Sequence, residues 1–174
     1  RRTYFSTVKP CGVDIEGLVK QVQEHIVHDG LVIRENIVRT NALKDNLLAA
    51  VVAVKSCFPL LCLGSDGTSK TLSLSLLLAQ LKGVYSETPL LRCLPQVQSF
   101  NLQLSEHTTA QHIHELKETV TSPSWNQNKN ATPCIFMEEM SMADPGEADG
   151  SPSFLVCFTC ALVSGIRLRM LLTR

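Results

Sequence analysis

The sequence predicts an α/β fold in which a parallel β-sheet is flanked by helices. Short apolar runs that suit buried strands alternate with longer segments whose apolar residues recur at helical spacing. Strands and helices that alternate in this way form parallel βαβ units. The chain has 174 residues, of which 44% are hydrophobic, and this suits one globular domain or a part of a larger one.

Two helices are expected before the first strand. The first, over residues 14–28, has Asp14 as its N-cap and ends at Gly30. Its apolar residues at helical spacing are Ile15, Leu18, Val19, Val22 and Ile26. The second, over about residues 42–55, has Asn41 as a candidate cap and a wide apolar face. Together they make residues 1–56 a helical lead-in to a core over residues 57–144.

The core begins with the apolar run 58–63, which predicts a strand buried on both faces. The helix that follows is expected to end at Gly83. The remaining elements are expected in the order loop 84–96, strand 96–104, helix from Thr108 or Thr109 to about residue 120, loop 121–133 and strand 134–137.

Residues 145–174 differ in character from the core. A turn-rich stretch precedes the uncharged apolar run 153–166, which is followed by the basic segment RLRMLLTR. The apolar run is shorter than the roughly 20 residues that span a bilayer, so it does not favour a membrane span. We expect a buried strand or helix here, or the non-native end of a truncated product.

Charge and cysteine content narrow the classes of partner and compartment. Lys plus Arg and Asp plus Glu both number 16, so the overall charge does not favour nucleic acid or an anionic membrane as a partner. The seven cysteines are scattered, and several lie in apolar runs, where a reduced cysteine packs as a small hydrophobe. A reducing compartment is indicated, and we expect a cytoplasmic location.

The stretch LLCLGSDGTSKT follows the pattern of a phosphate-binding loop. Glycines allow backbone N–H groups to surround a phosphate, and the helix that begins after the loop adds the positive end of its dipole. Gly64, Gly67, Lys70 and Thr71 match the loop known as Walker A, with an apolar strand before it and a helix after it. Ser69 stands where glycine is usual, which leaves a simple Gly/Ser turn as an alternative.

Paired carboxylates supply the second half of this interpretation, the acidic strand end known as Walker B. The strand CIFM is followed directly by Glu138 and Glu139. A nucleotide-hydrolysing enzyme needs one acidic group to position Mg²⁺ and another to polarise the attacking water. Ordinary solvated carboxylates at a strand end are the alternative.

Residues 28–144 resemble an AAA+ module of the mysterin family, giant RING-type ubiquitin ligases with a dynein-like AAA+ core. The resemblance is carried by NALKDN, PLLCLG and GTSKTLS, and then by SEHTTAQHI and FMEEMSMAD. A serine beside the loop lysine is familiar in that family. The resemblance implies a fragment of the large subdomain of a P-loop NTPase that binds and hydrolyses ATP with Mg²⁺. It also implies neighbouring AAA+ modules in a ring, and a ubiquitin-ligase segment elsewhere in the parent protein.

The resemblance also assigns roles to residues of this chain. The phosphate-binding residues would be Gly64, Ser65, Asp66, Gly67, Thr68, Ser69, Lys70 and Thr71. Thr71 and Glu138 would hold Mg²⁺, and Glu139 would orient the water.

Two departures from the family pattern favour weak or absent hydrolysis. The negative charge of Asp66 opposes phosphate unless its side chain points to solvent, and Glu138 is one methylene longer than the usual aspartate. No polar sensor residue on a fourth strand, arginine finger or helical lid is recognisable in the sequence. The alternatives to an ATP-binding module are an inactive structural module and a truncated fragment that cannot complete its fold.

Overall fold

The computed structural model describes residues 14–122, 131–139 and 169–173. Its helices are α1 (Ile15–His25), the π-helical turn η1 (Ile26–Gly30), α2 (Asn41–Ser56), α3 (Lys70–Gln80), the 3-10 turn η2 (Gly83–Tyr85), α4 (Pro89–Arg92) and α5 (Ala110–Thr121). Its strands are β1 (Leu60–Cys62), β2 (Val97–Gln103), β3 (Thr132–Glu138) and β4 (Arg169–Thr173).

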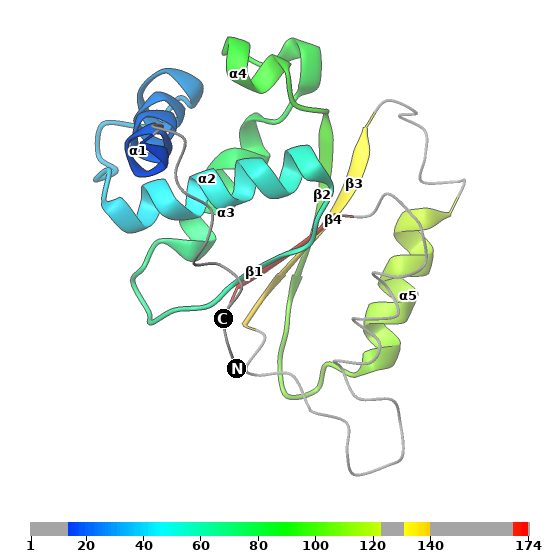
Figure 1. Cartoon of the computed structure of the whole chain (residues 1–174). Helices are drawn as coiled ribbons and strands as arrows, with labels where there is room; N and C mark the ends of the chain where they lie inside the picture. The colour runs from blue at the N-terminus through cyan, green and yellow to red at the C-terminus, as the bar shows by residue number, and fades with distance from the viewer. Residues whose placement is uncertain (1–13, 123–130, 140–168, 174) are drawn as a thin grey trace, which may run out of the picture.

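The four strands form one parallel sheet in the order β1-β4-β3-β2. Helices α2 and α3 cover one face of this sheet, and α5 covers the other (Figure 1). The strands alternate with helices along the chain, and parallel strands need such crossover helices. The expected α/β architecture is therefore confirmed.

The first two helices form where the sequence predicts them, with one change of cap. Asp14 caps α1, because its Oδ1 accepts a hydrogen bond of 3.0 Å from the Gly17 N–H. The cap of α2 is Thr40 rather than Asn41, since the Thr40 hydroxyl accepts from the Leu43 N–H at 3.2 Å. Asn41 is already the first helical residue, one position after the residue that caps the helix.

The segment around α3 also differs from the sequence prediction. The helix ends at Gln80, three residues before Gly83, and Gly83 instead begins η2 with φ of +61°. Residues 84–96 are not only loop, because they contain the short helix α4. Thr88 caps α4, with Pro89 at the first helical position, where the missing N–H of proline costs nothing.

The prediction that residues 58–63 form a strand buried on both faces is wrong. Strand β1 is only three residues long and lies at one end of the described sheet. Leu61 is 47% exposed and Phe58, just before the strand, is 69% exposed. Leu61 points to the face opposite Cys62, and the apolar cluster described under α5 on that face contains no residue of β1.

Part of the C-terminal segment belongs to the sheet, although the sequence sets residues 145–174 apart from the core. Strand β4 lies between β1 and β3 and pairs with both in parallel. The apolar run 153–166 lies outside the described residues. The core sheet therefore extends beyond the expected boundary at residue 144.

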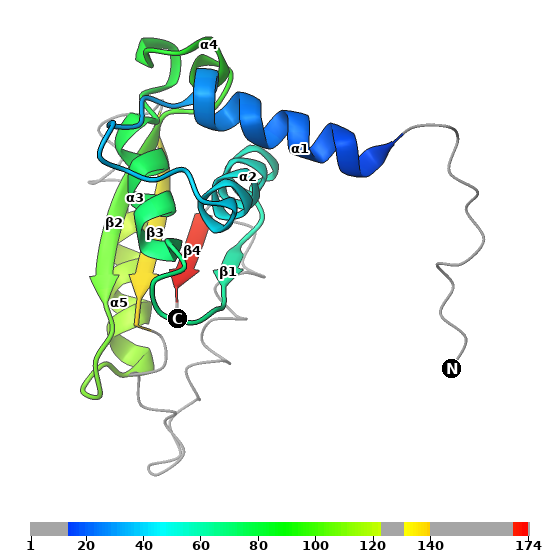
Figure 2. The same ribbon diagram turned by 90° about the vertical axis from the view of Figure 1, so that its left-hand side faces the viewer.

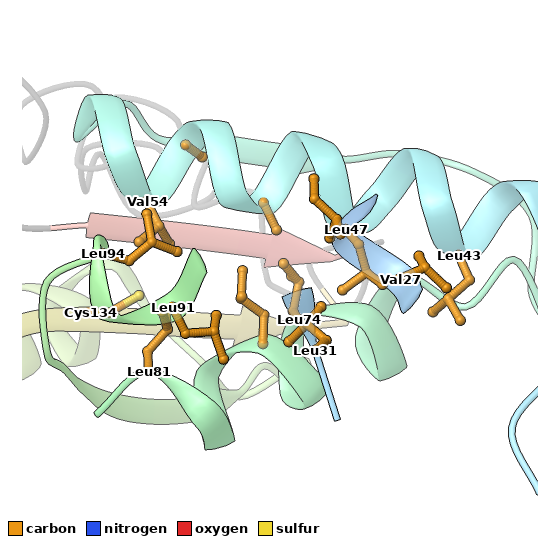
Figure 3. Packing of buried hydrophobic residues seen from close by; sticks show 14 of the residues in the cluster. Val27, Leu31, Leu43, Leu47, Val54, Leu74, Leu81, Leu91, Leu94 and Cys134 are labelled. Atoms are coloured by element: carbon orange, nitrogen blue, oxygen red, sulfur yellow. The ribbon is translucent and has the colours of Figure 1, made fainter. Parts of the chain in front are cut away.

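Apolar side chains fill the space between the sheet and helices α2 and α3. Leu43, Leu47 and Val54 of α2 meet Leu74 of α3 and Cys134 of β3 (Figure 3). A smaller cluster under α5 joins Ile113 and Val120 to Ile135 and Met137 of β3. Alternate residues of β3 thus point to opposite faces, and both faces are buried.

Helix α1 packs on α2, and its N-terminal end extends away from the other helices (Figure 2). Most of the apolar stripe of α1 is exposed to solvent. None of its residues is buried, and Ile15 is 67% exposed. The stripe becomes buried only at Ile26 and Val27 of η1. Among the described residues, no helix combines the length and the apolar character needed to cross a membrane.

The side chain of Gln80 ties the end of α3 to the extended segment after η1. Its Oε1 accepts from the Val32 N–H at 2.8 Å, and its Nε2 donates to the Val32 carbonyl at 3.1 Å and to the Leu76 carbonyl at 3.1 Å. The Gln80 side-chain amide therefore bonds both the N–H and the carbonyl of Val32, as the backbone of a neighbouring strand would.

Replacing Gln80 with glutamate is expected to destabilise the fold by about 1–2 kcal/mol at neutral pH, because a carboxylate would face two carbonyl oxygens. Urea unfolding at pH 7 measures this loss. The loss should shrink below about pH 4, where a protonated glutamate donates again. Gln21→Glu, on the exposed surface of α1, is the matched control. Equal losses for the two variants would contradict this role of Gln80.

Candidate nucleotide site

The candidate loop lies at the carboxyl edge of the parallel sheet, between β1 and α3. Because the carboxyl ends of parallel strands meet at one edge, the residue after β3 comes to the same place. The two segments border a cavity of about 240 Å³. Its lining residues are Asp66, Gly67, Thr68, Ser69, Lys70, Thr71, Leu72 and Glu139.

Lys70 is the buried cation of this site. It is the first residue of α3 and is only 9% exposed. Its Nζ donates hydrogen bonds of 2.7 Å to the carbonyls of Gly64 and Ser65, and lies 3.3 Å from Thr68 Oγ1. The loop thus wraps around its own lysine, and an anion that binds here must compete with two carbonyl oxygens for the ammonium group.

The loop needs unusual backbone conformations at two positions. Gly67 has φ of +78° and Ser69 has φ of +58°, both in the left-handed region. Glycine adopts this region without cost, but serine does not, so the departure from glycine at Ser69 carries strain. At Gly64 the reason for glycine is space, since a Cβ there would lie 3.2 Å from Thr68 Oγ1.

The two carboxylates take different positions at the end of β3. Glu139 lines the cavity and also has a left-handed backbone, with φ of +59°. Glu138 is the last residue of β3 and is half-buried. By the alternation of the strand it lies on the same face as Phe136, which is the face covered by α2 and α3. Glu138 is not among the residues that line the cavity.

Asp66 and Cys62 refine the electrostatics of the site. Asp66 lines the cavity while remaining exposed, so water screens its charge. Burial raises the pKa of the Cys62 thiol, and the nearby Lys70 ammonium only partly opposes that shift. The raised pKa favours the protonated thiol, which is the less nucleophilic form.

The structure adds a fourth strand that the sequence does not reveal. Its last paired residue, Thr173, is polar and lies in register with Cys62 at the end of β1. Strand β4 lies in the basic segment RLRMLLTR, whose pattern does not predict a strand inside the sheet.

Asn46 of α2 is a further residue that sequence reasoning missed. Its Nδ2 donates to the Thr68 carbonyl at 2.9 Å, across 22 residues of sequence. Asn46 belongs to the segment NALKDN, but nothing in that pattern shows that it touches the loop.

A protein-family model described as the RNF213 AAA domain matches residues 36–150. The chain belongs to this family. The RNF213 AAA domain assignment confirms the mysterin-family resemblance, and the parallel sheet with its flanking helices fits a P-loop NTPase fragment.

Curated relatives agree with this assignment over part of the chain. The E3 ubiquitin-protein ligase RNF213 of Mus musculus is 37% identical over 84 residues, or 48% of this chain, and that of Homo sapiens is 34% identical over 85 residues, or 49%. The E3 ubiquitin-protein ligase rnf213-beta of Danio rerio is 26% identical over 120 residues, or 65% of this chain. The chain spans only about 2% of the length of each of these relatives.

Proposed function

We propose that this AAA+ module binds ATP through the loop of residues 64–71. The observation that carries the proposal is the buried Lys70 ammonium in a loop at the start of a helix, beside Glu139. Lys70 supplies charge to the outer phosphates, while backbone N–H groups of Gly67 and Ser69 donate hydrogen bonds. Membership of an AAA domain family supports nucleotide binding in general.

Thr71 and Glu138 are the residues that we assign to Mg²⁺. Thr71 follows the loop lysine directly and lines the cavity, whereas Glu138 does not line it but ends β3 on the face covered by α2 and α3, next to Glu139. Hydroxyl and carboxylate oxygens suit this hard cation. When bound, Mg²⁺ supplies neutralisation of phosphate charge. Asp66 lines the same cavity, and because it is exposed its charge opposes the phosphates only weakly.

Glu139 is our candidate for orienting the attacking water. It borders the cavity directly after the end of β3, and Lys70, Thr71 and Leu72 of α3 border the same cavity. Hydrolysis in the isolated chain is expected to be slow, because a neighbouring module must supply an arginine to stabilise the transition state. We therefore place the chain beside other AAA+ modules in a cytoplasmic, RNF213-like parent protein, and assign ubiquitin-ligase activity to that parent alone.

A second candidate function is that of a structural module with an unused site. Two observations favour it: the loop carbonyls already occupy Lys70, and Asp66 lines the cavity. Calorimetric titration with Mg²⁺-ATP separates the candidates. Heat of binding at a single site supports the ATP-binding module, and no heat from a nucleotide-free, folded chain supports the structural module.

Replacing Glu139 with glutamine is expected to lower single-turnover hydrolysis by at least about 100-fold, because an amide does not accept the proton from water. Affinity for Mg²⁺-ATP should change by less than about twofold, since the binding groups remain. Release of inorganic phosphate over hours measures the rate. Glu106→Gln, in the exposed turn before α5, is the matched control and should hydrolyse at the wild-type rate. An unchanged rate in Glu139→Gln would remove Glu139 from the mechanism.

A further inference from the structure

Asn46 holds one peptide of the phosphate loop from outside the loop. Its hydrogen bond to the Thr68 carbonyl is 2.9 Å long and partly buried. The other side-chain hydrogen bonds described for the carbonyls of residues 64–69 come from Thr68, which binds the Ser65 carbonyl, and from Lys70, which binds the Gly64 and Ser65 carbonyls. Within the described residues, Asn46 is thus the side chain that ties this loop to α2.

The anchored carbonyl fixes the direction of the next N–H group. A trans peptide is planar, with its C=O and N–H pointing in opposite directions, and the described chain has no cis peptide. When the Thr68 carbonyl points to Asn46, the Ser69 N–H must point away from α2. Thr68 and Ser69 both line the cavity. The hydrogen bond from Asn46 therefore holds the Ser69 N–H in an orientation in which it can donate to an anion bound in the cavity.

This orientation opposes the intrinsic preference of Ser69. Ser69 has φ of +58°, which is unfavourable for any residue with a Cβ. Rotation of the Thr68–Ser69 peptide would reverse this φ to a negative value and would relieve the strain. The same rotation would turn the Ser69 N–H toward α2 and the Thr68 carbonyl toward the cavity. A glycine at position 69 would have no such preference.

We infer that Asn46 is a positioning residue for nucleotide binding, which holds the Thr68–Ser69 peptide in its binding orientation against the strain at Ser69. The inference rests on the proposed function. It accounts for a loop that works with serine where glycine is usual, because the cost of the left-handed serine is offset by a hydrogen bond from α2. Thr71 and Glu139 act on other groups and are not affected directly.

The test is a double-mutant cycle between Asn46→Ala and Ser69→Gly in the full 174-residue chain, with Mg²⁺-ATP affinity measured by calorimetry. Without the anchor, a strained Ser69 leaves about one molecule in ten in the binding orientation, so Asn46→Ala should weaken affinity about tenfold. In the Ser69→Gly background both orientations are similarly populated, and the loss should be only about twofold. Asn41→Ala, an exposed asparagine of the same helix, should leave affinity unchanged.

Thermal unfolding without nucleotide gives a second readout. Asn46→Ala should cost more affinity with Ser69 than with glycine at position 69, but more stability with glycine than with Ser69. With Ser69, the peptide can rotate and recover its strain, so loss of the anchor should cost little stability. With glycine at position 69 there is no strain to recover, and Asn46→Ala should lower Tm by at least about 2 °C more. A merely structural role for Asn46 predicts equal losses in both backgrounds.

The possible outcomes separate this inference from the proposed function. Equal affinity losses in the two backgrounds would overturn the positioning role while leaving ATP binding intact. If the wild type binds no Mg²⁺-ATP, the proposed function fails. The unfolding measurements then still decide whether Asn46 holds the peptide: a larger Tm loss with glycine supports the anchor, and equal losses overturn it.

Discussion

Replacing Lys70 with alanine is expected to abolish the thermal stabilisation of this chain by Mg²⁺-ATP. A ligand that binds only the folded state stabilises it by about 2.7 kcal/mol at a hundredfold excess over Kd. For a domain of this size, that free energy raises Tm by about 5–10 °C. Lys70 brings the buried positive charge of the site, so its loss should remove most of this shift. Differential scanning fluorimetry with and without Mg²⁺-ATP measures the effect.

Lys82→Ala is the matched control for this experiment. Lys82 is exposed, lies beyond the end of α3 and does not line the cavity. It should keep the full wild-type shift. A shift that persists in Lys70→Ala would mean that the nucleotide binds elsewhere, or that the loop binds it without its lysine. No shift in a folded, nucleotide-free wild type would favour the structural module.

Replacing Phe136 with alanine is expected to lower the free energy of unfolding by about 3–5 kcal/mol. Phe136 is the largest fully buried side chain of β3 and belongs to the core cluster between the sheet and helices α2 and α3. Its removal leaves a cavity that the neighbouring strands cannot close. Domains are stable by only about 5–15 kcal/mol, so the variant would approach the limit of folding. Urea unfolding followed by circular dichroism measures the loss.

Phe58 offers a direct comparison, because both phenylalanines lie in apolar runs that predict buried strands. Phe58 is 69% exposed, just before β1. Phe58→Ala should therefore change stability by less than about 0.5 kcal/mol. Similar losses for the two variants would mean that Phe58 is buried in the folded chain, contrary to its exposure in the structure.

Most helices could be predicted from the sequence because their signals are local. The cap at Asp14, the apolar face of α2 and the glycine-containing loop before α3 all lie within a few residues of the structure that they direct. The strands β2 and β3 have clear apolar or alternating patterns. The sequence predictions were wrong where contacts with distant residues determine the structure. These are the exposure of residues 58–63 and the end of α3, where the Gln80 side chain bonds Val32.

The candidate site divides in the same way. That Lys70, Thr71 and Glu139 border one cavity could be predicted, because motif spacing beside strand ends brings such residues to the same edge of a parallel sheet. The contact of Asn46 with the loop could not be predicted, because it depends on how α2 packs, and the pairing of Thr173 with Cys62 could not, because it depends on the order of the strands.

By itself, the sequence determined the α/β class and the residues of the loop, because periodicity and motif spacing are properties of neighbouring residues. The family followed from the resemblance of segments such as NALKDN and GTSKTLS to a known family. The tertiary structure alone decided that residues 169–173 lie between β1 and β3, that Ser69 is left-handed and that Asn46 supports it. These features depend on backbone hydrogen bonds between distant segments, and residue types do not specify the partners of such bonds.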